Sequence, residues 1–188
     1  MPPFSLIARR WLPLAALTTV ACLLVYLEVQ QSIRAAANDP QIQLAEDAVA
    51  ALERGEPLDK VFDAAKVDMA RSLTPFLIVY DESGKAIGGS GTLRGQSPAP
   101  PIGVFEFTRT NGEERVTWQP ERGVRIASVV LRTTTKPAAW VLAGRNMREI
   151  ERREAYAHNV AAGALAATLC ITLLLVTIGE SISSSSRV

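Results

Sequence analysis

The sequence has few of the side chains on which most catalytic and metal sites depend. Its 188 residues include two cysteines and one histidine. Cys22 and Cys170 lie inside apolar segments, so we interpret them as small apolar side chains that cannot cross-link the middle of the chain. His158 sits at the edge of the second apolar segment. We therefore expect neither a Ser-His-Asp or Cys-His catalytic arrangement nor a Cys/His metal site.

The sequence also lacks a strong net charge. It has 20 Lys and Arg against 19 Asp and Glu, which gives a net charge of +1. Nucleic-acid binding needs clustered basic residues, so we do not expect a nucleic-acid partner. The acidic residues form no Asp-x-Asp-x-Asp calcium loop, and "GGSG" at 88–91 lacks the Lys-Ser/Thr of a phosphate loop. We expect no enzymatic activity, no metal and no cofactor.

Two long runs of the chain contain no charged residue. They are "WLPLAALTTVACLLVYL" at 11–27 and "VAAGALAATLCITLLLVTI" at 160–178. The shorter run would form a helix of about 25 Å, which is enough for a bilayer core. Trp11 and Tyr26 lie near its ends, where aromatic residues meet the membrane surface. We predict transmembrane helices over 11–29 and 158–179, and hence a lipid membrane as a partner.

A cleaved signal peptide is the alternative for the first run. Ala35, Ala36 and Ala37 offer a small-residue cleavage site. The apolar run is longer than a usual signal-peptide core, however, and these alanines lie well past its end. An uncleaved signal anchor is the favoured interpretation.

The arginines flanking the two runs give conflicting signals on orientation. Arg9 and Arg10 precede the first run, which places the N-terminus in the cytoplasm. Four arginines precede the second run and argue for the opposite orientation. The loop between the runs exceeds roughly 100 residues, and long loops cross a membrane largely regardless of charge. We predict cytoplasmic ends (1–10 and 180–188) and an external domain (30–157).

Small residues recur four apart in the second apolar run. Gly163 and Ala167 form a small-xxx-small pair, which lets helices approach closely in lipid. We predict a helix–helix contact here, either between the two spans or across a homodimer. The alternative is that such residues are simply common in membrane spans.

The segment after the first run is predicted to be helical. Asp39 fits an N-cap, with Pro40 at the first helical position and Gly55 as the terminating residue. Apolar residues in between recur at spacings of three and four, which indicates one buried stripe. "PLDKVFDAAK" at 57–66 predicts a second, short helix, with Leu58, Val61, Phe62 and Ala65 on one face.

Strands are predicted from residue 76 onward. The fold class is α+β: an antiparallel sheet of five or six strands, covered on one side by the N-terminal helices and flanked by two transmembrane helices. Asn111-Gly112 predicts a tight hairpin between two of the strands. A charged helix is predicted from Asn146 into the second apolar run. The predicted strands are Phe76–Asp81, Lys85–Gly89, Val104–Thr110, Glu114–Gln119, Gly123–Thr133 and Ala139–Ala143.

Three stretches resemble a known family in this order. They are "FLIVYDESGKAIGGSG" (76–91), "GVRIASVVLR" (123–132) and "WVLAGRNMREIERRE" (140–154). Together with the flanking apolar runs, this layout resembles the extracytoplasmic Cache or PAS-like sensor domain of bacterial sensor histidine kinases and chemoreceptors. The resemblance implies a protein of the bacterial inner membrane, whose periplasmic domain detects a signal and passes it through the membrane helices. The residues after Ile178 contain no kinase or methyl-accepting region, so the output is expected from a signalling partner protein.

Two other functions remain open at this point. The protein could be a structural or assembly protein that binds another envelope protein. It could also be the amino-terminal part of a split sensor kinase.

A small-molecule ligand of the domain would need polar side chains on the sheet. The candidates are Tyr80, Arg109, Trp118, Arg125 and Arg132, because arginine binds carboxylates and aromatic residues line pockets. Strand alternation places Arg125 and Arg132 on opposite faces, so they cannot line one pocket without a bulge. The alternative is that the aromatic residues are core and the arginines are solvated.

Overall fold

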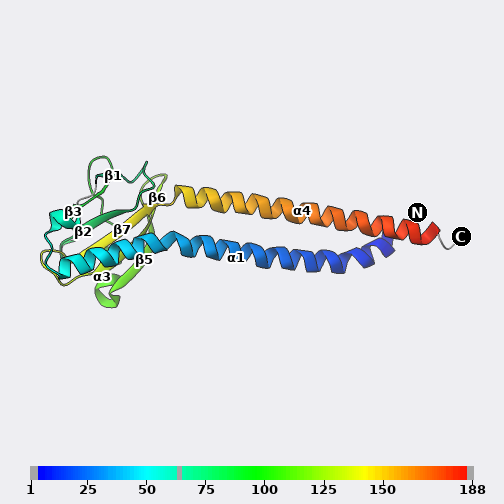
Figure 1. Cartoon of the computed structure of the whole chain (residues 1–188), viewed down its shortest axis with the longest axis horizontal. Helices are drawn as coiled ribbons and strands as arrows, with labels where there is room; N and C mark the ends of the chain where they lie inside the picture. The colour runs from blue at the N-terminus through cyan, green and yellow to red at the C-terminus, as the bar shows by residue number, and fades with distance from the viewer. Residues whose placement is uncertain (1–3, 63–64, 186–188) are drawn as a thin grey trace. The chain divides into compact units, whose positions relative to one another are not determined.

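The computed structural model describes residues 4–62 and 65–185, which belong to two compact units (Figure 1). The helical unit comprises Met1–Ile33 with Arg152–Val188, and the sheet unit comprises Arg34–Glu151. The elements in chain order are α1 (Phe4–Glu53), α2 (Leu58–Val61), β1 (Val67–Asp68), β2 (Phe76–Tyr80), β3 (Ala86–Gly89), β4 (Gly91–Thr92), α3 (Ile102–Asn111), β5 (Glu113–Glu121), β6 (Val124–Arg132), β7 (Trp140–Asn146) and α4 (Arg148–Ser185).

Two helices are long and apolar enough to cross a membrane by length and composition. They are Phe4–Ile33 within α1 and Arg148–Ser183 within α4, with mean hydropathies of 2.0 and 2.3. Their large apolar side chains stay exposed in the protein, as at Leu17 and Leu175. A soluble protein rarely leaves so much contiguous apolar surface in water. The two helices are therefore compatible with a membrane protein.

The predicted helix start at Asp39 and Pro40 is wrong. Helix α1 continues through Pro40 as one element from Phe4 to Glu53. A proline inside a helix removes one hydrogen bond, but helix-forming residues on both sides propagate the helix past that gap. The predicted end is confirmed. Gly55 has φ +82°, its N–H donates to the Leu52 carbonyl, and Glu56 N–H donates to that of Ala51, as in a Schellman motif.

The second predicted helix is shorter than expected. Helix α2 spans Leu58–Val61, and part of the predicted range, 63–64, lies outside the described residues. Leu58, Val61 and Phe62 pack against the sheet as predicted, whereas Ala65 is exposed. Four residues cannot bury a longer apolar stripe, so α2 acts as a short cover over the sheet.

The main sheet has five antiparallel strands in the order β3-β2-β7-β6-β5. This confirms the predicted α+β class and the opening hairpin of β2 and β3. The Asp81 carboxylate holds the hairpin turn by accepting hydrogen bonds from the N–H groups of Ser83 and Lys85, at 2.9 and 3.0 Å. A small parallel ladder between β1 and β4 was not predicted.

The segment predicted as the strand Val104–Thr110 is a helix. Helix α3 follows Pro101, and it buries Val104, Phe105 and Thr108, which share one helical face. Gly112 ends the helix with φ +84°, and its N–H donates to the Thr108 carbonyl. Asn111-Gly112 therefore forms a helix terminus and not the predicted hairpin.

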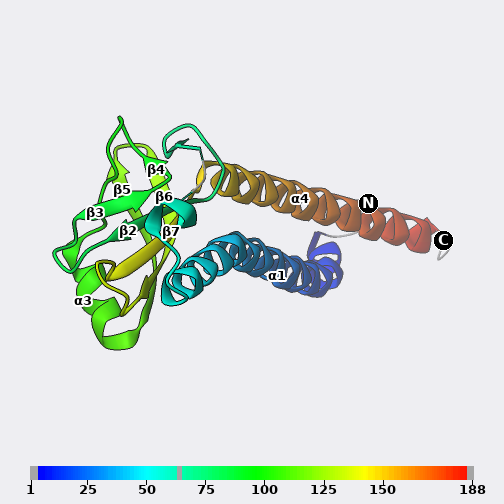
Figure 2. The same cartoon turned by 60° about the vertical axis from the view of Figure 1, so that its left-hand side comes forward.

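The two faces of the sheet carry different layers (Figure 2). The C-terminal part of α1 packs on one face, here called the α1 face, and α3 packs on the opposite one, here called the aromatic face. The alternation predicted for β6 is confirmed. Val124, Ile126 and Val130 lie on the aromatic face, while Val129 and Leu131 lie on the α1 face.

The last strand runs almost directly into the final helix, as predicted. Strand β7 is longer than the predicted Ala139–Ala143 and ends at Asn146. The Asn146 side-chain oxygen Oδ1 accepts from the Arg148 N–H at 2.8 Å, and its side-chain Nδ2 donates to the Met69 backbone carbonyl at 2.7 Å. This side chain joins the first turn of α4 to the segment that follows β1.

Candidate functional site

Within the helical unit, α1 and α4 contact each other along one seam, to which each helix contributes a narrow stripe of residues. The residues that are least exposed recur at spacings of three and four on both helices, as in a coiled-coil seam. On α1 the stripe is Trp11, Ala15, Thr18, Cys22, Tyr26 and Gln30. On α4 it is Ala157, Ala161, Leu165, Leu169, Thr172, Val176 and Glu180.

Polar contacts fix the register of this antiparallel helix pair at both ends. Arg10 forms an ion pair with Glu180, whose side chain is only 7% exposed. The indole N–H of Trp11 donates to the Thr172 hydroxyl at 3.1 Å. A shift of one helix along the other would break both contacts, so the pair has a defined register.

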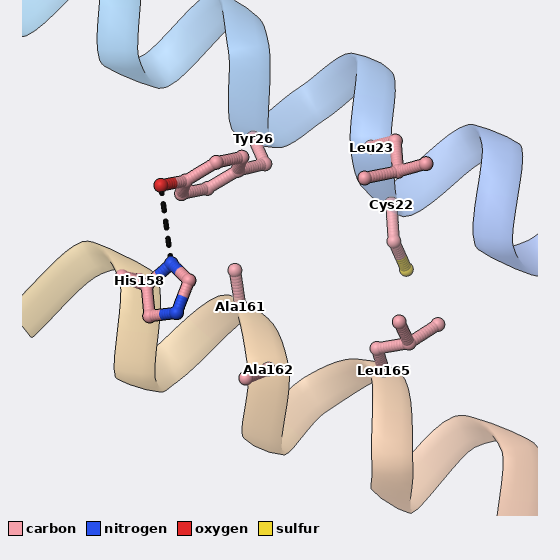
Figure 3. A pocket seen from close by; sticks show the side chains of 7 residues that line it. All are labelled: Cys22, Leu23, Tyr26, His158, Ala161, Ala162 and Leu165. Atoms are coloured by element: carbon pink, nitrogen blue, oxygen red, sulfur yellow. Dashed lines mark hydrogen bonds between the residues drawn. The ribbon is translucent and has the colours of Figure 1, made fainter.

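The other end of the seam contains the only histidine of the sequence (Figure 3). Tyr26 Oη lies 3.2 Å from His158 Nδ1, and Gln30 Nε2 donates to the same hydroxyl at 2.5 Å. Beside this pair lies a cavity of about 180 Å³, lined otherwise by Cys22 and apolar side chains of both helices. His158 thus serves as an interhelical hydrogen-bonding partner, and no described group of three or more His, Cys, Asp or Glu side chains could hold a metal ion.

Gly163 and Ala167 lie outside the α1–α4 seam. Both are exposed, and a side chain built at Gly163 would meet nothing within 4 Å. Of the two predicted alternatives, the contact between the two spans is therefore wrong within one chain. The other alternative, a contact across a homodimer, stays a prediction.

Two of the predicted ligand residues belong to the core of the sheet unit. Tyr80 is fully buried and its hydroxyl donates to the Pro98 carbonyl at 2.6 Å. Its burial raises the pKa of the phenol. Trp118 is buried, and its indole N–H donates to the Ser128 hydroxyl at 2.8 Å. Both side chains are satisfied inside the protein.

The structure brings Arg109 and Arg132 together, although one lies on α3 and the other ends β6. Both guanidinium groups lie over the Trp140 ring, at 5.3 and 4.9 Å from its centre. Both also face the carboxylate of Glu82 in the β2–β3 turn, at 3.5 Å from Arg109 and 2.5 Å from Arg132. Arg109 was predicted on a strand and reaches this cluster only because its segment is helical.

The charge of Glu82 is stabilised by its neighbours. The hydrogen bond from Arg132 lowers the pKa of the Glu82 carboxyl below its ordinary value, and the charges of Arg132, Arg109 and Lys136 add to this. In the same turn the Ser83 hydroxyl, which donates to Asp81 at 2.6 Å, lowers the pKa of that carboxyl. The turn is thus held by two ionised carboxylates.

Arg125 is separate from this cluster, as strand alternation predicted. It forms an ion pair with Glu151 in the first turns of α4, at 2.6 Å. The backbone repeats this link, because the Arg125 carbonyl accepts from the Met147 N–H at 2.9 Å. Arg125 therefore attaches α4 to the sheet.

A polar cleft runs along β3, one of the two outer strands of the sheet, and sequence reasoning missed it. Its volume is about 450 Å³, and all four residues of β3 line it, together with Lys66, Lys85, Gln96 and Ser97. Lys66 Nζ donates to the Gly89 carbonyl at 2.6 Å. Both lysines are exposed. Isolated lysines far apart in the sequence carried no signal that could have identified this cleft.

Comparison with known proteins assigns no relationship to this arrangement. No protein-family model matches the chain, and no curated protein matches it.

Proposed function

We propose that the protein is a sensory or regulatory subunit of the bacterial inner membrane, anchored by two spans and without catalysis of its own. The sheet unit is its Cache/PAS-like domain and faces the periplasm. A signal received by this domain changes how the two helices are held, and a partner protein in the membrane reads that change. The five-stranded antiparallel sheet, with helices α1 and α4 leaving it, supports this proposal.

The observation that carries the proposal is the continuity of both helices. Helix α1 packs on the sheet through Ala45, Ala48 and Leu52, and the same helix includes the apolar segment Phe4–Ile33. Helix α4 is tied to the sheet by Glu151 and includes the second apolar segment. Any rearrangement of the sheet unit that moves these attachments acts on both helices directly.

The helical unit has the properties of an element that can respond. The register of its seam depends on a few polar contacts at the two ends. Interhelical hydrogen bonds of this kind are worth only about 1 kcal/mol each in a membrane. A small displacement of one helix along the other would therefore break these contacts at a low cost in free energy.

Sidedness tests the proposal first. Ser83, in the exposed β2–β3 turn, is changed to Cys in a chain with Cys22→Ala and Cys170→Ala, and intact spheroplasts are treated with a membrane-impermeant thiol reagent. We expect labelling of Ser83→Cys without lysis. The matched control is Ser183→Cys in the same background, which should be labelled only after lysis. The reverse pattern would place the sheet unit in the cytoplasm and overturn the proposal of a periplasmic sensor.

A further inference from the structure

Strand β3 forms one of the two edges of the main sheet. Among the described residues β3 pairs with β2 alone, and no strand pairs with its other edge. The Ser90 N–H, directly after β3, donates to the Leu77 carbonyl of β2, so the backbone groups of Ser90 face β2. By alternation Gly89 directs its backbone groups outward, while the register shift opposite Val79 and Tyr80 places Ile87 at a bulge of the edge. An edge of this kind is a template on which another extended chain can form hydrogen bonds.

The Lys66 side chain is hydrogen-bonded to one of the outward backbone groups. Its ammonium group donates to the Gly89 carbonyl, at the place where the N–H of an added strand would donate. The lysine is an exposed and flexible side chain, so an incoming strand can displace it. The ammonium group then remains beside the added strand and favours a negative charge there.

The cleft is charged at both ends of the strand. Lys85 directly precedes β3, and Lys66 contacts Gly89 at its other end. Two copies of this edge would bring lysines together, which disfavours pairing with a second copy of the chain. Acidic side chains near the ends of an added strand would instead meet a lysine at each end. With Gln96 and Ser97 opposite the strand, the cleft has room for the side chains of such a segment.

From these observations we infer that β3 binds an extended, acidic peptide segment of a partner protein, which adds to the sheet as a sixth strand. The inference deepens the proposed function, since its role as a signal input rests on that proposal. It is consistent with the packing of the sheet, because Tyr80 and Trp118 are buried in the core, and Arg109 and Arg132 are tied to Glu82. The edge remains as an accessible recognition surface of the sheet unit.

The test measures binding of a synthetic peptide to the full chain in detergent micelles. The probe is a fluorescent heptapeptide of sequence Thr-Glu-Val-Thr-Val-Glu-Thr, which carries glutamates four residues apart. Two modified peptides accompany it: one with Gln in place of both Glu, and one with N-methylation of the central Thr, which removes a strand hydrogen bond. We expect saturable binding of the first peptide, and binding of the N-methylated peptide weaker by about tenfold.

The protein variants separate the cleft from general charge attraction. Lys66→Glu and Lys85→Glu should each weaken binding of the acidic peptide by about fivefold, and much less that of the Gln peptide. The matched control is Lys60→Glu, which reverses an exposed lysine of α2 that does not line the cleft. It should leave binding unchanged.

Several results would overturn the inference. One is equal binding of the N-methylated and unmodified peptides, which would indicate charge attraction without strand addition. Another is displacement of the peptide by glutarate at equal concentration, which would make the cleft a site for small carboxylates. A third is no peptide binding together with a dimer that Lys85→Glu strengthens, since the substitution replaces a repulsion between lysines by an attraction; this would assign the edge to a second copy.

The inference and the proposed function can be refuted independently of each other. Labelling of Ser83→Cys in intact spheroplasts without peptide binding would leave the proposed function standing and remove this inference. Peptide binding with labelling only after lysis would retain the strand-binding edge and remove the proposed periplasmic sensor.

Discussion

The two faces of the sheet are packed in different ways. The aromatic face buries large rings: Phe105 packs in tilted contacts against Tyr80 and Trp140, with ring centres 5.0 and 4.7 Å away. The α1 face is built mainly from alanine and valine, with Ala45 and Ala48 of the helix against Val79, Val129 and Ala143 of the sheet. Large rings bury more apolar area per residue and lose more when truncated. The difference indicates that the aromatic face supplies stability, while the face with small side chains lets α1 lie close to the sheet.

Among substitutions on the two faces, truncation of the largest ring should lower the stability of the sheet unit the most. Trp140 is 1% exposed and contacts Phe105 and both clustered arginines. We expect Trp140→Ala to lower the free energy of unfolding of the sheet unit by about 3–5 kcal/mol, because it leaves a cavity in the core. Urea unfolding of the purified chain, followed by far-UV circular dichroism, measures this.

Trp140→Phe is the matched control. The indole N–H of Trp140 is buried without a hydrogen-bond partner, so replacing it by Phe removes an unsatisfied donor together with some volume. This variant should lose much less stability than Trp140→Ala. An equal loss in both variants would show that the indole, and not the ring packing, carries the contribution.

An enlarged side chain on the α1 face should have an intermediate effect. Ala48 is 4% exposed and lies between the helix and the sheet. We expect Ala48→Leu to destabilise the unit by about 1–3 kcal/mol, because the helix must move away to fit the extra volume. The control is Glu46→Leu at an exposed position of the same helix. Similar unfolding curves for the wild type and Ala48→Leu would mean that α1 packs loosely on the sheet.

The smallest expected effect concerns pH at the edge of the aromatic face. The folded-state pKa of Glu82 is lowered, chiefly by Arg132, so its contribution to stability is present above the unfolded pKa of about 4.3. That contribution is lost as the pH falls through the lower folded pKa. We expect Glu82→Gln to lower the melting temperature slightly at neutral pH and to match the wild type in strong acid.

The melting temperature of both proteins is measured across that pH range. In an Arg132→Gln background the same substitution should show a smaller pH dependence, because the main cause of the pKa shift is gone. A difference between wild type and Glu82→Gln that stays constant with pH would contradict an ionic role for Glu82.

Much of the sheet could be predicted from local pattern. The β2–β3 hairpin, the two faces of β6 and the passage of β7 into α4 all follow from apolar alternation and turn residues. The end of α1 followed from Gly55. In each case a short-range signal coincides with the burial that the fold requires.

The errors arose where local preference and tertiary burial disagree. Residues 102–111 include two Phe, two Thr, one Ile and one Val, all of which favour strands, yet Val104, Phe105 and Thr108 are buried on one side of a helix. Pro101 before the segment and Gly112 after it are helix-end signals that could have corrected the assignment. Pro40 caused the other error. Proline often marks the first turn of a helix, but here it lies inside helix α1.

The candidate sites depended more strongly on the tertiary structure. Arg109 and Arg132 were selected by residue type, but their common partner Glu82 lies far from both in the sequence. The cleft along β3 gave no local signal, because Lys66, Lys85 and Gln96 come together only when the sheet forms.

By itself the sequence determined the α+β class, the two long apolar helices and most strand positions, because these follow from composition and from periodicity over a few residues. Only the tertiary structure decided which strands form the edges of the sheet, which charges meet and which face of α4 contacts α1. Those features depend on pairs of residues distant in the chain, and a contact between such residues is set by the packing of whole elements.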